Sequence, residues 1–527
     1  MSNIKVLDCT LRDGGYINNW DFGLEKSKSI VKLLNNSNID YIELGFLTKE
    51  KTNNNMTLFN NFSDFQNIVS ENIDYNKLFG MITYGKFPIE DVPNVNDSII
   101  KGIRLIFKKS QAEKALDYCK NLKQKGYKLF INPTFIDQFS DIELINIINE
   151  INQINPYGMS IVDSMGVLKE KDLLRLYYLI DHNLNKDIAL CFHSHNNLQL
   201  SFSNAQCLMK VCKDRELIID STVFGMGRGA GNLCTELLTQ YINDNYDGNY
   251  DIIPILKIVD EQINPIFAKT PWGYSVPYYL AATNHCHPNY AKYLVDKQTV
   301  PVEFINNLLK SIPDNKKSVF DANLIKQLYL DKFSNAIDDT KTVEYMKNLL
   351  DDKKILILAP GKSLKDDKSK IEDFINKENP FIISLNFIPE QYRENLVFVT
   401  NMKRFTSLND YSRPLVVSSN IEDIPKQALI LNYSSYLNDS KMFDNVALML
   451  LKLLIKINIK SVSIAGLDGF SPIATENYVS ENLINNAKVS EFDERNDIMS
   501  EEISKFSAKI DINFITPTLY KIKQTIL

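Results

Sequence analysis

Three short segments of the chain carry residue types that are common in metal-dependent active sites. They are DCTLRDGG at 8–15, HSH at 193–195 and GMGRGAGN at 225–232, and each follows an apolar run that predicts a strand. His193 and His195 are two residues apart, so on a strand both imidazoles point to the same side and can reach one ion. Together with Asp13 and the amide of Asn232 they form a mixed nitrogen and oxygen ligand set. Such a set suits Mn²⁺, Mg²⁺, Zn²⁺ or Co²⁺ and leaves positions for substrate oxygens.

Taken singly, each segment has a simpler interpretation. Two histidines in an HxH pattern are more often structural or surface residues than metal ligands, and an RDG tripeptide is usually a turn. A glycine-rich loop late in a barrel often binds phosphate instead of helping to hold a metal. The order of the three segments along regularly spaced units favours the metal site over these alternatives.

The elements that must position these segments alternate between apolar runs and amphipathic stretches. This alternation predicts a parallel α/β fold, and eight units in about 240 residues match a closed (β/α)₈ TIM barrel. An open doubly wound sheet would alternate in the same way. In a barrel the carboxyl ends of the strands meet at one face, where the three segments would converge. The predicted strands are 4–9, 41–46, 78–83, 102–107, 128–132, 158–162, 188–192 and 217–223.

Size and composition restrict the remaining classes of protein. A chain of 527 residues exceeds what one hydrophobic core usually holds, so at least two domains are expected. Its formal net charge of −6 argues against nucleic acid or an anionic membrane as a partner. No apolar run reaches the ~18–20 residues of a membrane span, and the N-terminus lacks an export signal. The seven cysteines form no CxxC pair, so we expect a soluble, cytoplasmic protein without a disulfide framework.

The pattern along the chain predicts three parts. Residues 1–250 form the TIM barrel and 251–350 a helical extension. Residues 351–527 begin with a second strand–turn–helix pattern, which predicts a Rossmann-like α/β domain. The strands predicted in this part are 355–358, 381–385, 396–400, 415–417 and 461–465. We place the domain boundary near 350, at the charged segment Asp351–Lys354.

The predicted barrel resembles a known superfamily of metal-dependent lyases and aldolases. Its members include 4-hydroxy-2-oxovalerate aldolase, hydroxymethylglutaryl-CoA lyase and isopropylmalate synthase. The resemblance covers roughly residues 4 to 245 and is highly specific. It rests on LDCTLRDGGY at 7–16, IELGF at 42–46, DSMGVL at 163–168, HSHNNLQLSFSNA at 193–205 and GMGRGAGN at 225–232.

The resemblance implies a role for each of these residues. Arg12 would neutralise the developing enolate oxygen, Glu43 would orient Arg12 or line the pocket, and Ser164 would hold the carboxylate of a keto acid. We expect Gly14, Gly15 and Arg104 to contact substrate as well. The implied metal ligands are Asp13, His193 and His195, with Asn232 as a further ligand.

The chain departs from its relatives at one catalytic position. Bacterial hydroxy-oxovalerate aldolases carry a histidine three residues after the metal aspartate, whereas this chain has Tyr16 there. We expect the aromatic loop 271–288 to close over the barrel mouth, so that His285 or His287 supplies the missing acid–base group. The alternative is that both histidines are structural, in which case Tyr16 is a candidate base.

The C-terminal part gives a weaker signal. The turn APGKSL at 359–364 follows a buried strand, a pattern that favours anion binding. This turn and SIAGLDGFS at 463–471 faintly resemble bacterial sialyltransferase-like and pterin-diphosphokinase-like domains. The resemblance implies a nucleotide or nucleotide-sugar ligand, and a structural or homodimerisation domain is the alternative.

These features together predict a divalent-metal aldolase, with Mn²⁺ or Mg²⁺ as the favoured ion. It would make or break a carbon–carbon bond between the enolate of a pyruvate-like 2-keto acid and an aldehyde, which a sugar could carry. Two alternatives remain open. One is Claisen-type condensation or cleavage of an acyl-CoA. The other is a non-catalytic barrel that serves as scaffold for a nucleotide-binding C-terminal domain.

Overall fold

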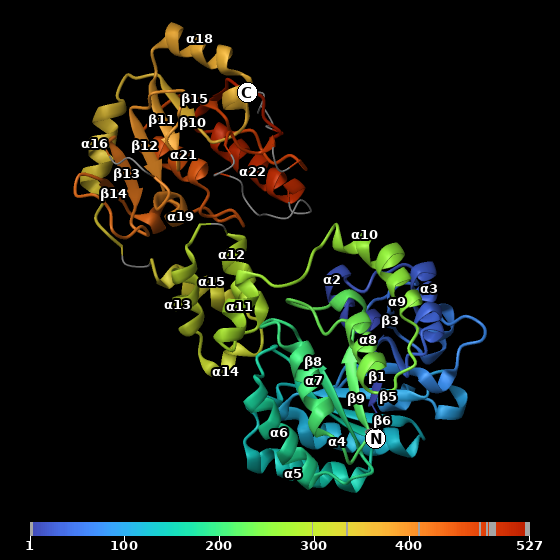
Figure 1. Ribbon diagram of the computed structural model, residues 1–527. Helices are drawn as coiled ribbons and strands as arrows, with labels where there is room; N and C mark the ends of the chain where they lie inside the picture. The colour runs from blue at the N-terminus through green and yellow to red at the C-terminus, as the bar shows by residue number, and fades with distance from the viewer. Residues whose placement is uncertain are drawn as a thin grey trace. The chain divides into compact units, whose positions relative to one another are not determined.

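A computed structural model describes residues 4–297, 299–333, 336–408, 412–473, 476–480, 483 and 492–521. The chain forms two compact units, each of which is considered by itself. The first comprises Met1–Asn289 and Lys317–Val319, and the second Tyr290–Lys316 and Phe320–Leu527. Figure 1 shows the strands of the first unit surrounded by their connecting helices.

The first unit is a closed parallel barrel of eight strands. Its strands follow one another in the order β1, β9, β8, β7, β6, β5, β4 and β2, and pairing between β1 and β2 closes the ring. The eight strands predicted from sequence are thereby confirmed, with ends that shift by one or two residues. They are β1 Ile4–Asp8, β2 Tyr41–Leu47, β4 Leu78–Thr83, β5 Gly102–Phe107, β6 Lys128–Pro133, β7 Gly158–Asp163, β8 Ala189–Ser194 and β9 Leu217–Ser221; a short strand β3, Leu58–Phe59, pairs with β2 outside the ring.

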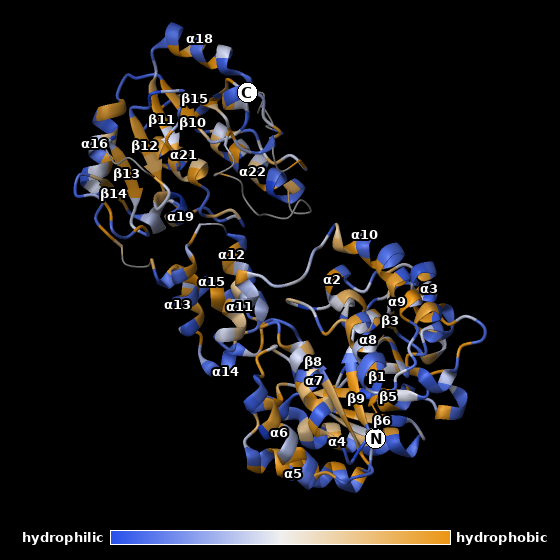
Figure 2. Ribbon diagram, viewed as in Figure 1, coloured by the Kyte–Doolittle hydropathy of each residue, from blue (hydrophilic) through white to orange (hydrophobic). Residues whose placement is uncertain are grey.

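Amphipathic helices cover the outside of the barrel. In α4, for example, Ala115, Leu116, Cys119 and Leu122 are buried on one face, as the apolar spacing predicts. Figure 2 shows the apolar colour concentrated on the strands and on the inner faces of these helices. The helices of this unit are α1 Thr10–Asp13, α2 Gly15–Asn18, α3 Leu24–Asn36, α4 Ala112–Gln124, α5 Asp141–Ile154, α6 Glu170–Asn183, α7 Ser201–Val211, α8 Thr235–Asn245, α9 Ile252–Ile258, α10 Asn264–Phe267 and α11 Val276–Thr283.

The second unit contains a separate, wholly parallel sheet of seven strands. Its order is β14, β13, β12, β11, β10, β15 and β16, so the chain starts in the interior of the sheet and extends it first to one side and then to the other. The five strands predicted here are present, whereas the edge strands β14 and β16 were not predicted. The strands are β10 Ile355–Leu358, β11 Phe381–Leu385, β12 Leu396–Val399, β13 Leu415–Ser418, β14 Leu429–Leu431, β15 Ser461–Ala465 and β16 Asp511–Phe514.

The helices of the second unit include several that precede its sheet in sequence. Tyr329 of α15 lies against Tyr433 and Asp444, which belong to the sheet domain. The two compact units therefore divide near Asn289, whereas the sequence pattern placed the boundary near 350. The helices are α12 Pro288–Asp296, α13 Val302–Lys310, α14 Asp314–Lys317, α15 Ala322–Asp331, α16 Thr340–Leu350, α17 Ser363–Asp366, α18 Lys368–Glu378, α19 Met402–Phe405, α20 Tyr433–Tyr436, α21 Val446–Lys456 and α22 Phe492–Ser507.

Among the residues described, none of the helices combines the length and the apolar character that crossing a membrane requires.

Candidate active site in the barrel

The turn that follows β1 carries the first two site residues. Arg12 and Asp13 lie in the short helix α1, and both are buried. The Nε1 of Trp20 donates to the carbonyl oxygen of Arg12 over 2.7 Å and holds the turn from outside. A Cβ at position 15 would lie 2.0 Å from the Trp20 ring, so only glycine fits there. Gly14 is also tightly packed, against Met226, and contact of either glycine with substrate stays a prediction.

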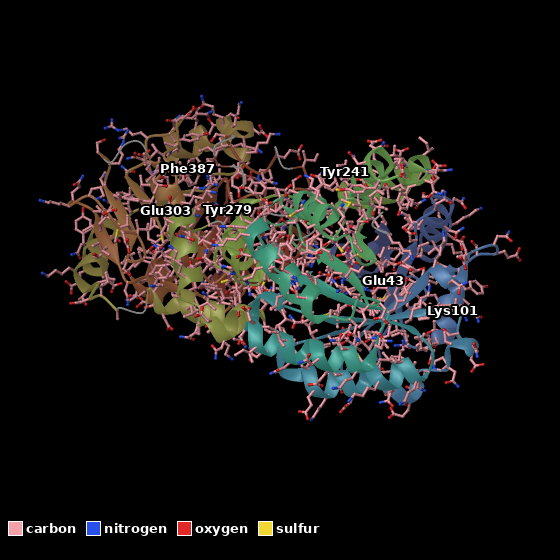
Figure 3. All side chains as sticks on the ribbon, turned by 60° about the horizontal axis from the view of Figure 1, so that its bottom comes forward. Glu43, Lys101, Tyr241, Tyr279, Glu303 and Phe387 are labelled. Atoms are coloured by element: carbon pink, nitrogen blue, oxygen red, sulfur yellow. The ribbon has the colours of Figure 1, made fainter. Side chains whose placement is uncertain are left out.

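Arg12 is held between two carboxylates. Its Nε donates to Glu43 over 2.7 Å and its Nη1 donates to Asp13 over 2.6 Å. Glu43 belongs to β2 and lies among the barrel strands, where Figure 3 labels it. Burial by itself raises the pKa of Asp13, but Arg12 and the neighbouring histidines outweigh it and hold the pKa below its usual value. Asp13 is therefore a carboxylate at neutral pH, as a metal ligand must be.

Three predicted ligands converge at the carboxyl end of the barrel. Asp13, His193 and His195 each offer one ligand atom, and these atoms all lie within 4.8 Å of one another. Within the described residues, the Nδ1 of His195 and the Oδ1 of Asn232 are buried without a hydrogen-bond partner, which is consistent with a role as metal ligands. Burial, together with nearby arginines, lowers the pKa of His195 to about 3, so the imidazole is neutral and able to bind a metal. The residues thus fit a divalent ion.

Asn232 lies beside this cluster, at the end of the glycine loop. Its Nδ2 donates to Asp13, which leaves its Oδ1 as the ligand-type atom. A Cβ at Gly227 would come within 2.4 Å of the Asn232 amide, so that glycine lets the loop approach the site. Asn232 as a further metal ligand remains a prediction that this arrangement supports.

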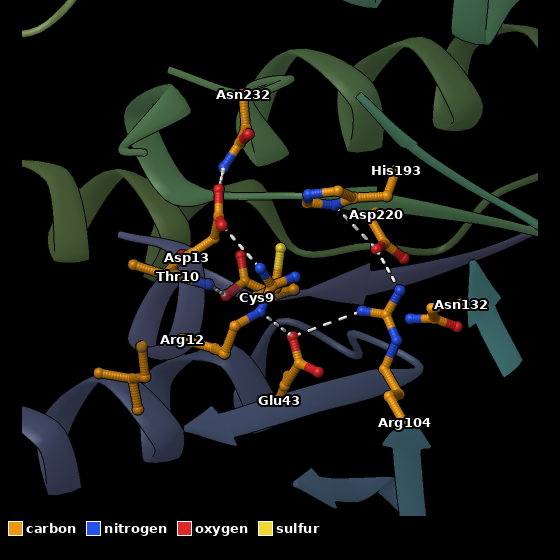
Figure 4. A network of polar contacts seen from close by, with 12 residues as sticks. Cys9, Thr10, Arg12, Asp13, Glu43, Arg104, Asn132, His193, Asp220 and Asn232 are labelled. Carbon is orange, nitrogen blue, oxygen red and sulfur yellow. Dashed lines mark hydrogen bonds and ion pairs between the residues drawn. The ribbon is translucent and has the colours of Figure 1, made fainter. Parts of the chain in front are cut away.

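A second row of charges lies inside the barrel, below the cluster (Figure 4). Arg104 is fully buried and forms ion pairs with Glu43 and Asp220. The Nδ1 of His193 is 3.0 Å from Asp220. Arg104 therefore links the carboxylate that holds Arg12 to the carboxylate that orients His193. This geometry does not support the predicted contact between Arg104 and substrate.

The sequence reasoning missed Asp220. The signal was a single carboxylate at the end of an otherwise apolar run, LIID, because a charge on a buried strand requires a buried partner. Burial raises the pKa of Asp220, but Arg104 and His193 outweigh burial and lower the pKa overall. The Asp220 carboxylate can then accept a hydrogen bond from a protonated nitrogen of His193 and so fix the orientation of that ring. Carboxylate partners of metal-binding histidines commonly have this role.

A second group with metal-ligand character consists of Cys9, His193 and Asp220. Burial raises the pKa of the Cys9 thiol, and its Sγ donates to the carbonyl oxygen of Ser221. Asp220 is already paired with Arg104. A protonated thiol and an occupied carboxylate make this group the poorer cation site.

At the barrel mouth, Arg228 of the glycine loop contacts three other site candidates. Its Nη2 donates to the carbonyl oxygen of Ser164 over 3.0 Å, and its guanidinium lies 5.7 Å from the centroid of the Tyr16 ring. The Nη1 of Arg228 is 3.5 Å from the Nε2 of His287. The Tyr16 side chain is exposed at the mouth, and a phenol is protonated at neutral pH, so Tyr16 is a poor general base there.

The two loop histidines differ in their surroundings. His285 is exposed and adopts a left-handed backbone conformation with φ 53°, whereas His287 is only partly accessible and lies beside Arg228. Burial, with Arg228 and Lys108, lowers the pKa of His287 to about 3. The start of the loop is fixed as well, because Trp272 donates from its Nε1 to the carbonyl oxygen of Phe224 over 3.1 Å.

Comparison with known proteins identifies relatives of the barrel. Residues 103–260 match the HMGL-like family model. The chain is 22% identical over 267 residues to a 4-hydroxy-2-oxovalerate aldolase of Geobacillus genomosp. 3, a match that covers 50% of this chain and 77% of that protein. It is 23% identical over 272 residues to an oxaloacetate decarboxylase of Mycobacterium tuberculosis, covering 51% of this chain and 79% of that protein.

Among solved structures, a hydroxymethylglutaryl-CoA lyase from Pseudomonas aeruginosa is 16% identical. It aligns over 51% of this chain and 94% of its own, with a TM-score of 0.41. The HMGL-like match and the named relatives support a carbon–carbon lyase or aldolase that acts on small molecules. HMGL-like proteins are a divalent-metal family, and the buried Asp13, His193 and His195 supply metal-binding groups.

Proposed function

We propose that the barrel is a divalent-metal aldolase that makes or breaks a carbon–carbon bond between the enolate of a 2-keto acid and an aldehyde. The observation that carries the proposal is the position of Arg12 between Glu43 and Asp13, next to the ligand cluster. A bound cation would supply Lewis-acid stabilisation of the negative charge that develops on the keto oxygen.

Arg12 supplies the protein's own share of that stabilisation. Glu43 and Asp13 accept from its Nε and Nη1, and within the described residues we find no partner for its Nη2. This nitrogen is therefore the donor we assign to the enolate oxygen. Because Glu43 and Asp13 fix the guanidinium before substrate arrives, little reorganisation is required when the charge develops. Arg104 and Asp220 keep Glu43 and His193 in place and do not touch the substrate in this proposal.

In the cleavage direction, a base removes the proton of the 4-hydroxyl group, the carbon–carbon bond breaks and its electron pair forms the enolate. His287 is the acid–base candidate that the contacts favour, because it lies beside Arg228 at the mouth whereas His285 faces solvent. A substrate anion beside Arg228 would offset the positive charge that lowers the pKa of His287. Ser164, whose backbone carbonyl accepts from Arg228, lies where that anion would bind.

The proposal can be tested without knowing the aldehyde, because enolisation is the step that every keto-acid substrate shares. The purified chain is incubated with pyruvate in D₂O, with and without Mn²⁺ or Mg²⁺, and loss of the pyruvate methyl signal is followed by NMR. We expect exchange that requires metal. Arg12→Lys keeps the charge but loses the planar fork, so exchange should slow by on the order of 10²–10³-fold.

Arg175→Lys is the matched control, since Arg175 lies on the surface in an ion pair with Asp141. It should exchange pyruvate at the wild-type rate. Metal-independent exchange, or an Arg12→Lys variant as fast as wild type, would contradict the proposal. Metal-dependent exchange from an acyl-CoA instead of pyruvate would favour the Claisen-type alternative.

A further inference from the structure

The sheet of the second unit has a cavity at its carboxyl edge, at the point where its strand order reverses. The chain runs from β10 to β11 on one side and later places β15 on the other side of β10. In open parallel sheets this switch point is where ligands bind, because the loops after the two strands diverge. A cavity of about 200 Å³ lies there, lined by residues 359–361 after β10 and 466–470 after β15.

The floor of this cavity is made of closely packed backbone. Gly361 donates to the carbonyl oxygen of Gly466 over 2.8 Å. A Cβ at Gly361 would lie 2.3 Å from that oxygen, and Gly466 has a φ of +77° that L side chains rarely adopt. Both glycines are therefore required where the two loops meet, and the cavity is left with a floor that no side chain fills.

Basic and amide side chains form the walls. Lys297, Arg404 and Arg495 line the cavity, together with the amide side chains of Asn386 and Asn401. Burial lowers the pKa of both Lys297 and Arg404, which means that each cation has lost part of its hydration. A desolvated cation gains more from an anionic ligand than a cation in water does.

Two carboxylates also line the cavity, but other groups already engage them. Asp468 accepts from the backbone nitrogen and the hydroxyl of Ser363. Asp444 lies within hydrogen-bonding distance of the hydroxyls of Tyr329 and Tyr433. Among the described residues that line the cavity, three cations stand against two carboxylates that are already hydrogen-bonded, and this excess of positive charge favours an anion.

A second cavity of about 420 Å³, whose walls combine apolar and polar side chains, adjoins the first. Asn386, Arg404 and Leu483 line both cavities, so these three residues mark where the cavities meet. The walls of the second cavity include Phe387, Pro389 and Leu408. A ligand that occupies both cavities needs a polyanionic end and a flat, largely apolar end with polar edges.

We infer that the two cavities together bind a nucleoside diphosphate, with the phosphates beside Lys297, Arg404 and Arg495 and the nucleoside in the chamber of Phe387. A cleft at a switch point that combines a glycine-lined floor, basic walls and an adjoining chamber with Phe387, Pro389 and Leu408 in its wall has the parts that such a ligand requires. The inference does not depend on the function proposed for the barrel.

Binding can be measured by isothermal titration calorimetry on the full chain, in EDTA so that the barrel holds no metal. ADP, GDP, CDP and UDP are the nucleotide probes, and pyrophosphate and uridine are the partial probes. We expect at least one nucleoside diphosphate to bind in the micromolar range, and pyrophosphate more weakly. Arg404→Gln should weaken both by at least tenfold. Arg393→Gln, an exposed arginine that lines neither cavity, should bind like wild type.

Ser407→Trp tests the second cavity separately from the first. It also keeps the inference testable if Arg404→Gln does not fold. Ser407 is exposed and lines only the second cavity, so a tryptophan can fill that space from the solvent side. Nucleoside diphosphate binding should fall at least tenfold while pyrophosphate binding is unchanged. The inference is overturned if none of the four nucleotides binds at millimolar concentration, or if Arg404→Gln and Ser407→Trp leave nucleotide affinity unaltered in folded protein.

Discussion

The barrel site and the cavities of the second sheet both lie at the carboxyl ends of parallel strands, yet they are built differently. In the barrel the strands themselves carry the charges: Glu43, Arg104 and Asp220 lie within β2, β5 and β9. In the second sheet the strands are almost wholly apolar, as in ILIL of β10 and LVFV of β12, and the polar groups come from loops and helices.

The difference follows from the two architectures. Side chains on the inner face of a closed barrel must pack against one another, so a buried charge there needs a buried partner. The result is a rigid polar network, which suits chemistry that depends on charges fixed in advance. An open sheet is covered by helices on both faces, so its strands remain apolar and its loops diverge to leave a cavity. That arrangement suits the binding of a ligand.

The largest expected effect is on the stability of the second unit, and it depends on the residue at which the chain is cut to separate the two units. Tyr329 and Phe333 pack on Tyr433 of the sheet domain, with ring centroids 5.3 Å apart between Tyr329 and Phe333 and 5.2 Å between Phe333 and Tyr433. A fragment of residues 290–527 keeps these rings. A fragment of residues 351–527 loses Tyr329 and Phe333, at roughly 3–5 kcal/mol for each large aromatic side chain removed.

Such a loss is comparable with the whole stability of a typical domain. We therefore expect fragment 290–527 to melt cooperatively with an ordered near-UV circular dichroism signal, and fragment 351–527 to lack both. Limited proteolysis of the full chain should likewise spare the segment Asp351–Lys354. Equal melting temperatures for the two fragments, or rapid cleavage at 351–354, would favour the boundary predicted from sequence.

Much of the fold could be predicted because buried parallel strands are short apolar runs between helices. The runs at 102–107 and 355–358 are examples, and both are strands in the structure. The strands that escaped prediction lie at the two edges of the second sheet. β16 alternates between exposed and half-buried residues, and β14 has only three residues, so neither gives a strong apolar signal.

Part of the site could be predicted as well. Asp13, His193 and His195 were identified by motif and spacing, and the structure brings their ligand atoms together. The contact of Glu43 with Arg12 was also expected. The pairing of Arg104 with Asp220 was not predicted, because the two residues are 116 positions apart in sequence and their contact depends on the curvature of the closed barrel. Sequence spacing describes neighbours on one strand, whereas these contacts cross the interior between strands.

The second prediction tests whether the barrel network is organised around a metal. His195→Ala removes one of three buried ligand groups, so affinity for a divalent ion should fall by at least ~10²-fold and turnover should be lost with it. His182→Ala is the control, because His182 lies on the exposed side of α6 and hydrogen-bonds to Tyr178 within that helix.

Metal content is measured by elemental analysis after dialysis against a fixed free concentration of Mn²⁺ or Mg²⁺. We expect about one ion per chain in wild type and in His182→Ala, and far less in His195→Ala. Equal metal content in all three proteins would mean that the unpartnered nitrogen of His195 has another purpose. The barrel would then be closer to a scaffold than to an enzyme.

The smallest expected effect concerns Asp8, a buried carboxylate of the barrel that forms no ion pair with any residue the structure describes. It accepts from the backbone nitrogen of Thr10 over 3.0 Å and from the hydroxyl of Thr235 over 2.7 Å. Burial outweighs both hydrogen bonds and raises the pKa of Asp8 to about 6. This contrasts with Asp13, whose pKa the neighbouring arginine holds down, so the two carboxylates test how far pairing decides the charge state inside the barrel.

Because the pKa of Asp8 is higher in the folded chain than the ~3.9 of an unfolded aspartate, its contribution to stability is complete below about pH 4 and is lost as the pH rises through 6. Asp8→Asn has no such loss. The unfolding free energy of the variant relative to wild type should therefore rise by about 2–3 kcal/mol between pH 4 and pH 7.5. Thermal melting in EDTA measures this without interference from metal binding.

Asp141→Asn, at an exposed position on α5, should keep a constant offset from wild type across the same range. A constant offset for Asp8→Asn as well would mean that its two hydrogen bonds stabilise the carboxylate as much as burial disfavours it, and that a barrel carboxylate stays ionised even without a cationic partner.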